Sequence, residues 1–178
     1  MFAIVLAALD RSGSVLPILG AMAVHELAHV VMMLACGGQV RRLTLRFADL
    51  QIAASGLGYR QELLSALAGP LVNLICGAAF CMQRPSFAAY SLMLGIYNLL
   101  PVWPLDGGRM IRCALLVRLP ITQAEHISEI VSFAACAVLL LIGVFLTFFR
   151  KSGLWPLGTA AYLTVRLLML ARRTDAVQ

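Results

Sequence analysis

VLPILGAMAVHELAHVVMMLAC, residues 15–36, is an apolar run that contains the motif HELAH at residues 25–29. Such a run is long enough for a transmembrane helix, because about 20 apolar residues of helix span a bilayer. Two histidines four positions apart lie on one helix face, where both imidazoles can bind one Zn²⁺. Glu26 is then placed to act as a general base toward a water molecule. The alternative is a helix that carries the two histidines without a metal.

Composition indicates the class of protein. Hydrophobic residues make up 61% of the 178 positions and charged residues 12%. Soluble domains have about 45–50% and about 25% of these residues. We therefore expect an integral membrane protein of the all-α polytopic class. The net charge of +6 lies in short connections, so no nucleic-acid partner is expected. The five cysteines have no CxxC spacing, and they predict neither disulfides nor a thiolate zinc site.

The apolar runs predict five to six transmembrane helices. The short N-terminal run at residues 1–9 is the candidate sixth, although alone it is too short to span. The five main runs are residues 15–36, 62–82, 87–100, 128–149 and 154–170. Residues 109–119 predict a short helix, and a further helix start is expected at 122–125.

Residues 39–62 break this helical pattern. Leu43, Leu45 and Phe47 alternate with polar residues, which is the period of a half-buried strand. Residues 48–49 could turn the chain, and residues 50–54 could return as a second strand. We expect a short membrane-associated β-hairpin here, and an irregular basic loop is the alternative.

The second run carries small or polar residues at every fourth position: Ser65, Gly69, Asn73 and Gly77. Such a face lets two membrane helices approach closely. Asn73 should therefore face protein rather than lipid. Two roles stay open for this face, namely helix packing and a direct part in chemistry.

A broken helix is expected after residues 87–100. This run has 14 residues, or about 21 Å of helix, against a hydrocarbon core about 30 Å thick. Pro101 and Pro104 then prevent a regular helix. Irregular backbone at membrane depth occurs only where it is buried in protein or lines a wet cavity. Asp106 in this stretch is our candidate third metal ligand. The alternative is that Asp106 N-caps a helix starting near Arg109.

Charge asymmetry orients the chain. Basic residues are more numerous in the connections on the side that carries the hairpin, Asp106 and the C-terminus, which predicts that this side is cytoplasmic. His29 lies seven residues before Cys36, so about 10 Å from the cytoplasmic end of its helix. Asp106 and the histidines are thus expected at similar depth. The remaining histidine, His126, lies in a connection, and Glu62 at a span boundary is the next acidic candidate.

Three motifs together resemble the site-2 protease family of intramembrane zinc metalloproteases, and specifically its sporulation branch. They are HELAH, AGPL at residues 68–71 and NLLPVWPLDGG at residues 98–108. The resemblance implies that His25, His29 and Asp106 bind one zinc ion and that Glu26 activates water. It also implies that Asn98 contacts the substrate or the oxyanion.

The resemblance implies cleavage of a membrane-anchored protein substrate in or near its transmembrane segment, within the lipid bilayer. A sporulation sigma-factor precursor is the suggested substrate, and an anti-sigma factor or a signal-peptide remnant is equally compatible. The location would be a bacterial cell membrane or the membrane around a forespore, with a membrane inhibitor or regulatory partner as an open question. A zinc-binding adaptor or sensor that does not cleave, and a zinc transporter, are the alternatives.

Substrate contacts are expected at two places. The edge of the hairpin, with Leu43, Leu45 and Phe47, could hold an extended segment by strand addition. Asn73 is the other candidate. The chain departs from the family in its first membrane segment, which is absent or reduced to residues 1–9. We expect a single domain, residues 1–178, without a CBS or PDZ domain and without regulation through one.

Overall fold

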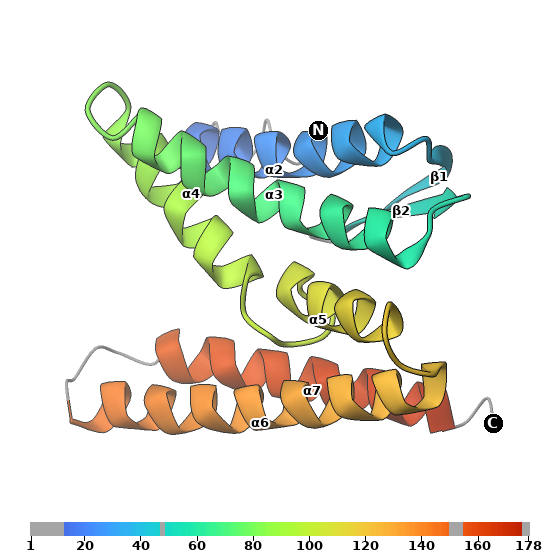
Figure 1. Cartoon of the computed structure of the whole chain (residues 1–178). Helices are drawn as coiled ribbons and strands as arrows, with labels where there is room; N and C mark the ends of the chain where they lie inside the picture. Colours follow the sequence, from blue (N-terminus) through green and yellow to red (C-terminus); the bar gives the residue numbers. More distant parts are fainter. Residues whose placement is uncertain (1–12, 47–48, 150–154, 176–178) are drawn as a thin grey trace. The chain divides into compact units, whose positions relative to one another are not determined.

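A computed structural model of the chain describes residues 13–46, 49–149 and 155–175 (Figure 1). The expected N-terminal run at residues 1–9 and Phe47 lie outside this range. The chain divides into two compact units, Met1–Leu99 and Leu100–Gln178, here called the N-terminal and C-terminal units. The described elements of the first are α2 (Val15–Ala35), β1 (Gln39–Arg46), β2 (Asp49–Ser55), α3 (Tyr59–Ala79) and α4 (Pro85–Asn98). Those of the second are α5 (Asp106–Leu116), α6 (Ile121–Phe148) and α7 (Trp155–Asp175).

Three of the described helices are long and apolar enough to cross a membrane, namely α2, α3 and α6. Together with the composition they support an integral membrane protein. Helix α4 has 14 residues, so it is as short as its apolar run predicted. The total of five to six spans stays a prediction. Helix α6 differs from its prediction, because the expected start at 122–125 and the expected span at 128–149 form one continuous helix.

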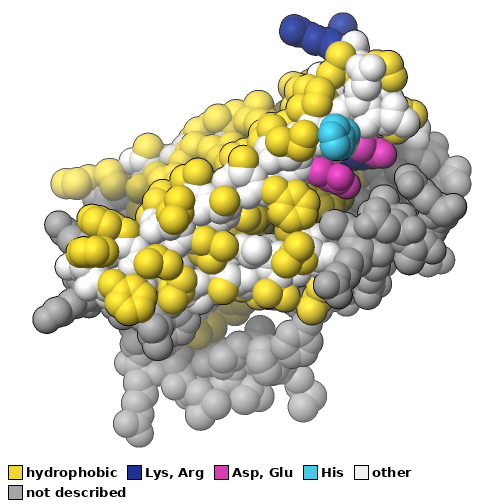
Figure 2. Space-filling model, turned by 90° about the horizontal axis from the view of Figure 1, so that it is seen from below, with side chains coloured by type: hydrophobic (Ala, Val, Ile, Leu, Met, Phe, Trp, Pro, Cys, Tyr) yellow, Lys and Arg dark blue, Asp and Glu magenta, His cyan; other side chains and the backbone are white. Residues whose placement is uncertain are grey.

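Outward faces of these helices carry apolar side chains, as a surface in contact with lipid requires. On α6, exposed large hydrophobic residues run along its length: Ile130, Phe133, Val138, Leu141, Phe145 and Phe148. Figure 2 shows apolar side chains over most of the described part of the face that it presents. The hydrophobic residues on these surfaces therefore need no further protein partner to explain them.

Helices α2, α3 and α4 pack through small residues in the N-terminal unit. The face of α3 that holds Ser65, Gly69, Asn73 and Gly77 is buried, as its spacing predicted. A methyl group at Gly77 would lie 3.2 Å from the carbonyl oxygen of Ala88 on α4. A methyl group at Gly95 would lie 3.1 Å from the carbonyl oxygen of Pro70 on α3. Glycine is needed at both positions because the backbones of α3 and α4 are this close.

Strands β1 and β2 pair antiparallel, with Leu43 opposite Ile52 and Leu45 opposite Leu50. The register shifts between Val40 and Arg42. Both strands extend further than the alternating pattern predicted. Association of this hairpin with a membrane surface stays a prediction.

Gln61 at the start of α3 closes the base of the hairpin. Its side-chain nitrogen donates to the carbonyl oxygen of Cys36 at the end of α2, at 3.1 Å. Its side-chain oxygen accepts from the backbone N–H of Gly58, at 2.8 Å. A methyl group at Gly38 would lie 3.0 Å from the carbonyl oxygen of Met33. The end of α2 and the start of α3 are therefore linked independently of the strands between them.

The C-terminal unit begins with the expected irregular segment, since helix stops at Asn98 and resumes at Asp106. Ser132 on α6 anchors this segment. Its hydroxyl accepts from the backbone N–H of Trp103 at 3.1 Å and donates to the carbonyl oxygen of Ser128 at 2.8 Å. Val102 in the same segment is fully buried. The non-helical backbone is thus packed in protein, as its depth in a membrane would demand.

Arg112 links α5 to both of its neighbours in this unit. Its guanidinium lies over the ring of Trp103 and pairs with Glu125 of α6 at 2.9 Å. Further along, α6 and α7 pack closely at Gly143, where a methyl group would lie 3.0 Å from the carbonyl oxygen of Pro156.

Candidate metal centre

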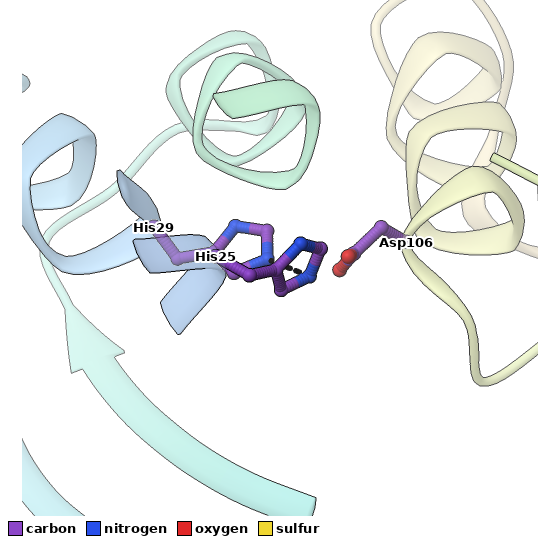
Figure 3. Close-up of side chains that lie close together, drawn as sticks. All are labelled: His25, His29 and Asp106. Atoms are coloured by element: carbon purple, nitrogen blue, oxygen red, sulfur yellow. Dashed lines mark hydrogen bonds between the residues drawn. The ribbon is translucent and has the colours of Figure 1, made fainter. Parts of the chain in front are cut away.

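His25 and His29 lie on one buried face of α2, one turn apart, as the HELAH spacing predicted. Their Nε2 atoms are 3.1 Å apart (Figure 3). Two nitrogen ligands on one tetrahedral zinc ion, each at 2.0–2.1 Å, are separated by about 3.3 Å. The imidazole pair therefore has the spacing that a shared zinc ion requires.

Helix α3 orients His29 through its main chain. His29 Nδ1 lies 2.7 Å from the carbonyl oxygen of Ser65, which can only accept, so Nδ1 carries the proton. The Nε2 lone pair is then available for a metal. The Ser65 hydroxyl donates to the carbonyl oxygen of His29 at 3.3 Å. The sequence left the role of Ser65 open between helix packing and chemistry, because a backbone acceptor has no residue-type signal.

Gly69 gives the two rings their space. A methyl group there would overlap His29 Nε2 and would lie 2.9 Å from His25 Cε1. The side chain of any other L-amino acid would occupy the volume between α3 and the imidazoles. Gly69 was noted in the sequence only as part of a small-residue face and of the AGPL motif. Gly69 lies four residues after Ser65, the same spacing as between the two histidines. This shared spacing is the sequence signal that indicates its place beside them.

Asn73 lies behind His25 on the same face of α3. The amide nitrogen of Asn73 is 3.2 Å from His25 Nδ1, and the Asn73 side chain is fully buried. Its amide oxygen has no hydrogen-bond partner. The contact observed for Asn73 is thus with a histidine, and a substrate contact stays a prediction.

Glu26 and Asn98 are the two residues expected to act on the substrate. Glu26 is half-buried on α2, between the two histidines in sequence. Asn98 is the last residue of α4, and its amide nitrogen donates to the carbonyl oxygen of Leu94 at 3.1 Å. An amide nitrogen has two hydrogens, so one remains for a substrate oxygen. Both roles stay predictions.

Asp106 is the first residue of α5, and Leu105 occupies the N-cap position. The alternative in which Asp106 caps a helix near Arg109 is therefore wrong, because α5 starts three residues earlier. Asp106 Oδ1 lies 3.6 Å from the guanidinium of Arg109, and the positive end of the α5 dipole also favours the charged carboxylate. A methyl group at Gly108 would lie 2.5 Å from the backbone nitrogen of Trp103. Glycine there lets the first turn of α5 rest against the preceding segment.

His25, His29 and Asp106 are a set of described residues that could hold a metal ion, and Figure 3 draws all three. The set comprises two imidazoles and one carboxylate. Two histidines and one carboxylate are a ligand set of catalytic zinc sites, which keep a fourth position open. The residue types fit zinc, and the assignment of each ligand stays a prediction.

Comparisons with known proteins point to a class of membrane-bound zinc peptidase. Residues 83–142 match the model of peptidase family M50. The chain is 28% identical over 138 residues to stage IV sporulation protein FB of Bacillus subtilis, covering 70% of this chain and 47% of that protein. It is 26% identical over 133 residues to a zinc metalloprotease of Methanocaldococcus jannaschii, covering 67% of this chain and 39% of that protein.

A solved structure shares the fold. The site-2 protease from Methanocaldococcus jannaschii aligns with a TM-score of 0.67 and 19% identity, over 94% of this chain and 83% of that one. The predicted resemblance to the site-2 protease family is confirmed. The residue types of the set formed by His25, His29 and Asp106 fit a zinc cofactor. The chain spans less than half the length of the two curated relatives.

Proposed function

We propose that this protein is an intramembrane zinc metalloprotease, which hydrolyses a peptide bond in or near a transmembrane segment of a membrane-anchored protein. The observation that carries the proposal is the buried histidine pair of α2, whose Nε2 atoms are 3.1 Å apart on either side of Glu26 in sequence. Buried ionisable groups in an apolar helix are costly and mark functional sites. A zinc-binding pair with a carboxylate beside it fits hydrolysis better than storage or transport.

In this proposal His25, His29 and Asp106 hold the zinc ion. Bound zinc supplies Lewis acidity, which makes water a better nucleophile and polarises the peptide carbonyl. The carboxylate of Glu26 takes a proton from the attacking water and delivers it to the nitrogen of the leaving amine. The free amide hydrogen of Asn98 donates to the oxygen that becomes negative. One water is consumed as the C–N bond breaks and a C–O bond forms.

A transmembrane substrate must be extended before it can be cut, because helical hydrogen bonds shield its peptide groups. We propose that the hairpin binds the unwound segment by strand addition, with Leu43, Leu45 and Phe47 along the contact. The antiparallel pairing of β1 with β2 supports this role, because a two-stranded sheet retains unpaired edge groups.

Leu45→Pro tests the hairpin. Proline removes a backbone donor and should lower cleavage of a membrane-anchored substrate while zinc content stays at the wild-type level. Cleavage and metal content are measured on the same purified preparation. Unchanged cleavage would show that the substrate binds elsewhere.

We further propose a substrate class and a membrane location for this protein. The likeness to stage IV sporulation protein FB supports a sporulation sigma-factor precursor, and an anti-sigma factor or a signal-peptide remnant fits the same chemistry. The distribution of basic residues supports a site that faces the cytoplasm, in a bacterial cell membrane or the membrane around a forespore. A membrane inhibitor or regulatory partner would act on the same site.

Glu26→Gln tests the proposed activity directly. Glutamine has the size of glutamate but cannot take a proton, so zinc content should equal that of wild type while cleavage falls by about 10²- to 10⁴-fold. Both proteins are purified, assayed for zinc and mixed with a membrane-anchored substrate. Cleavage by both would remove Glu26 from its role. Zinc binding without cleavage by wild type on any substrate would favour the adaptor or sensor.

A further inference from the structure

The amide of Asn73 leaves a buried polar atom unsatisfied in the orientation observed. Its nitrogen faces His25 Nδ1 at 3.2 Å, and its oxygen has no partner, in a side chain that is fully buried. A buried acceptor without a partner costs about 1–3 kcal/mol. The two ends of an amide have nearly the same shape, so a half-turn about the last side-chain bond exchanges them without new space.

The two amide orientations select different tautomers of His25. With the nitrogen toward His25, Nδ1 accepts and the imidazole proton sits on Nε2. That proton can then be donated to His29 Nε2, 3.1 Å away, which can accept because His29 donates from Nδ1 to Ser65. With the oxygen toward His25, Nδ1 donates and Nε2 has its lone pair. Only the second tautomer can bind zinc through Nε2.

Ser91 on α4 is a second buried group that lacks a partner. Close contacts of α3 and α4 occur at Gly77 with Ala88 and at Gly95 with Pro70. Asn73 lies between the α3 members of these contacts, and Ser91 lies between the α4 members. The two residues are therefore at the same level of the helix interface. After the half-turn the Asn73 nitrogen takes the place of the oxygen and points away from His25. A rotation of the Ser91 side chain is then needed to bring its unpartnered hydroxyl to this nitrogen as an acceptor.

We infer that Asn73 is a positioning residue for the metal centre: its amide oxygen accepts from His25 Nδ1–H and holds His25 in the tautomer that binds zinc, with Ser91 bound to the amide nitrogen. The inference rests on the proposed zinc site. It reassigns Asn73 from substrate contact to support of a ligand. It also explains why two unpartnered polar groups lie at one level of an otherwise close-packed interface.

Zinc affinity of the purified full-length chain tests the inference. The affinity is measured by competition with a chromophoric chelator for wild type, Asn73→Leu, Asn73→Asp and Ser91→Ala. Leucine removes the acceptor at similar size, so affinity should fall about 10- to 100-fold, as for other residues that support a ligand. Aspartate keeps the acceptor, so Asn73→Asp should bind zinc at least as tightly as wild type. Ser91→Ala should show a smaller loss than leucine.

The order of the two Asn73 variants separates positioning from packing. If Asn73 only filled space, leucine would be tolerated and a buried carboxylate would be harmful, which is the reverse order. Thr164→Val is the matched control, because the Thr164 hydroxyl bonds within the C-terminal unit, to the carbonyl oxygen of Ala160 at 2.9 Å and to Cys136 of α6. Its zinc affinity should equal that of wild type.

Nitrogen NMR of ¹⁵N-histidine-labelled protein gives a readout independent of affinity. His25 in the zinc-loaded chain should show a protonated Nδ1, and an Nε2 proton there would overturn the inference. Wild-type affinity in Asn73→Leu, or tighter binding by Asn73→Leu than by Asn73→Asp, would also overturn it. A wild type that binds no zinc would overturn the proposed function as well, so the two failures are distinguishable. Should the leucine variant not fold, Asn73→Asp, Ser91→Ala and the NMR assignment decide.

Discussion

The histidine pair and Asp106 are held in contrasting ways within their own units. His25 and His29 project from the middle of a regular helix and are oriented by residues of α3 that recur every fourth position. Asp106 stands where a helix begins, after a segment of irregular backbone that is fixed by Ser132 and by the close approach of Gly108. Helix packing thus positions the two histidines of the proposed ligand set, and specific backbone contacts position Asp106.

The histidine pair and Asp106 should therefore be sensitive to different kinds of substitution. A helix face tolerates exchange of its exposed residues, but a small residue at its contact cannot grow. An irregular segment depends on individual hydrogen bonds, since no repeated pattern of backbone bonding supports it. Changes in α3 should therefore act on the histidines sterically, and changes in α6 should act on Asp106 through one bond.

Asp106→Asn should have the largest effect. A neutral amide is a poor zinc ligand, so zinc affinity should fall further than it does when a supporting residue is lost. That loss is typically about 10- to 100-fold. Cleavage should be lost with it. Metal content after dialysis against a weak chelator measures the change, and the Glu62→Gln variant serves as the control carboxylate. Retention of wild-type affinity would show that Asp106 is not a ligand and that the histidine pair recruits a different third group.

Gly69→Ala should have the next largest effect, and it should act on His25 and His29 rather than on Asp106. The added methyl group overlaps His29 Nε2, so α3 must move or the ring must turn. Overpacking of this kind costs about 1–3 kcal/mol of stability. Thermal unfolding in detergent and zinc affinity should both decline.

Gly158→Ala on α7 is the control for Gly69→Ala, since a methyl group there meets nothing within 4 Å. Alanine is the better helix former, so this change should leave stability equal or slightly higher. Equal behaviour of the two variants would mean that α3 does not press on the imidazoles.

Ser132→Ala should have the smallest effect, and it should act on the irregular segment that precedes Asp106. It removes the acceptor for the Trp103 N–H, and because this bond is only part-buried the cost should be about 1 kcal/mol, the lower end of the range for buried groups. Hydrogen exchange of the Trp103 amide should accelerate while exchange in α2 is unchanged. Faster exchange in both places would contradict the separation of the two parts.

Sequence alone predicted the histidine half well. Helix α2 ends within one residue of its apolar run, and the four-residue spacing of HELAH and of Ser65, Gly69, Asn73 and Gly77 placed the right faces inward. Both predictions follow from the helical period, which can be read directly from the residue types. What the period could not show is that Ser65 acts through its carbonyl, because every residue has one.

The irregular segment between α4 and α5 was predicted in outline only. Its prolines indicated a break, and the run of 14 apolar residues indicated a short helix, as observed. The start of α5 at Asp106, the role of Ser132 and the bond from Asn98 to Leu94 were not predicted. Each depends on a particular pair of atoms, and no repeated pattern of residue types encodes such pairs.

Gln61 has a consequence for how this chain can be altered. Because it bonds to Cys36 and to Gly58, the two ends of the hairpin segment meet at a fixed base. We therefore expect that the length and side chains of the two strands can be replaced while the helix that carries HELAH keeps its place. Under the proposed strand addition, grafting the two strands alone should transfer substrate selectivity between such proteins.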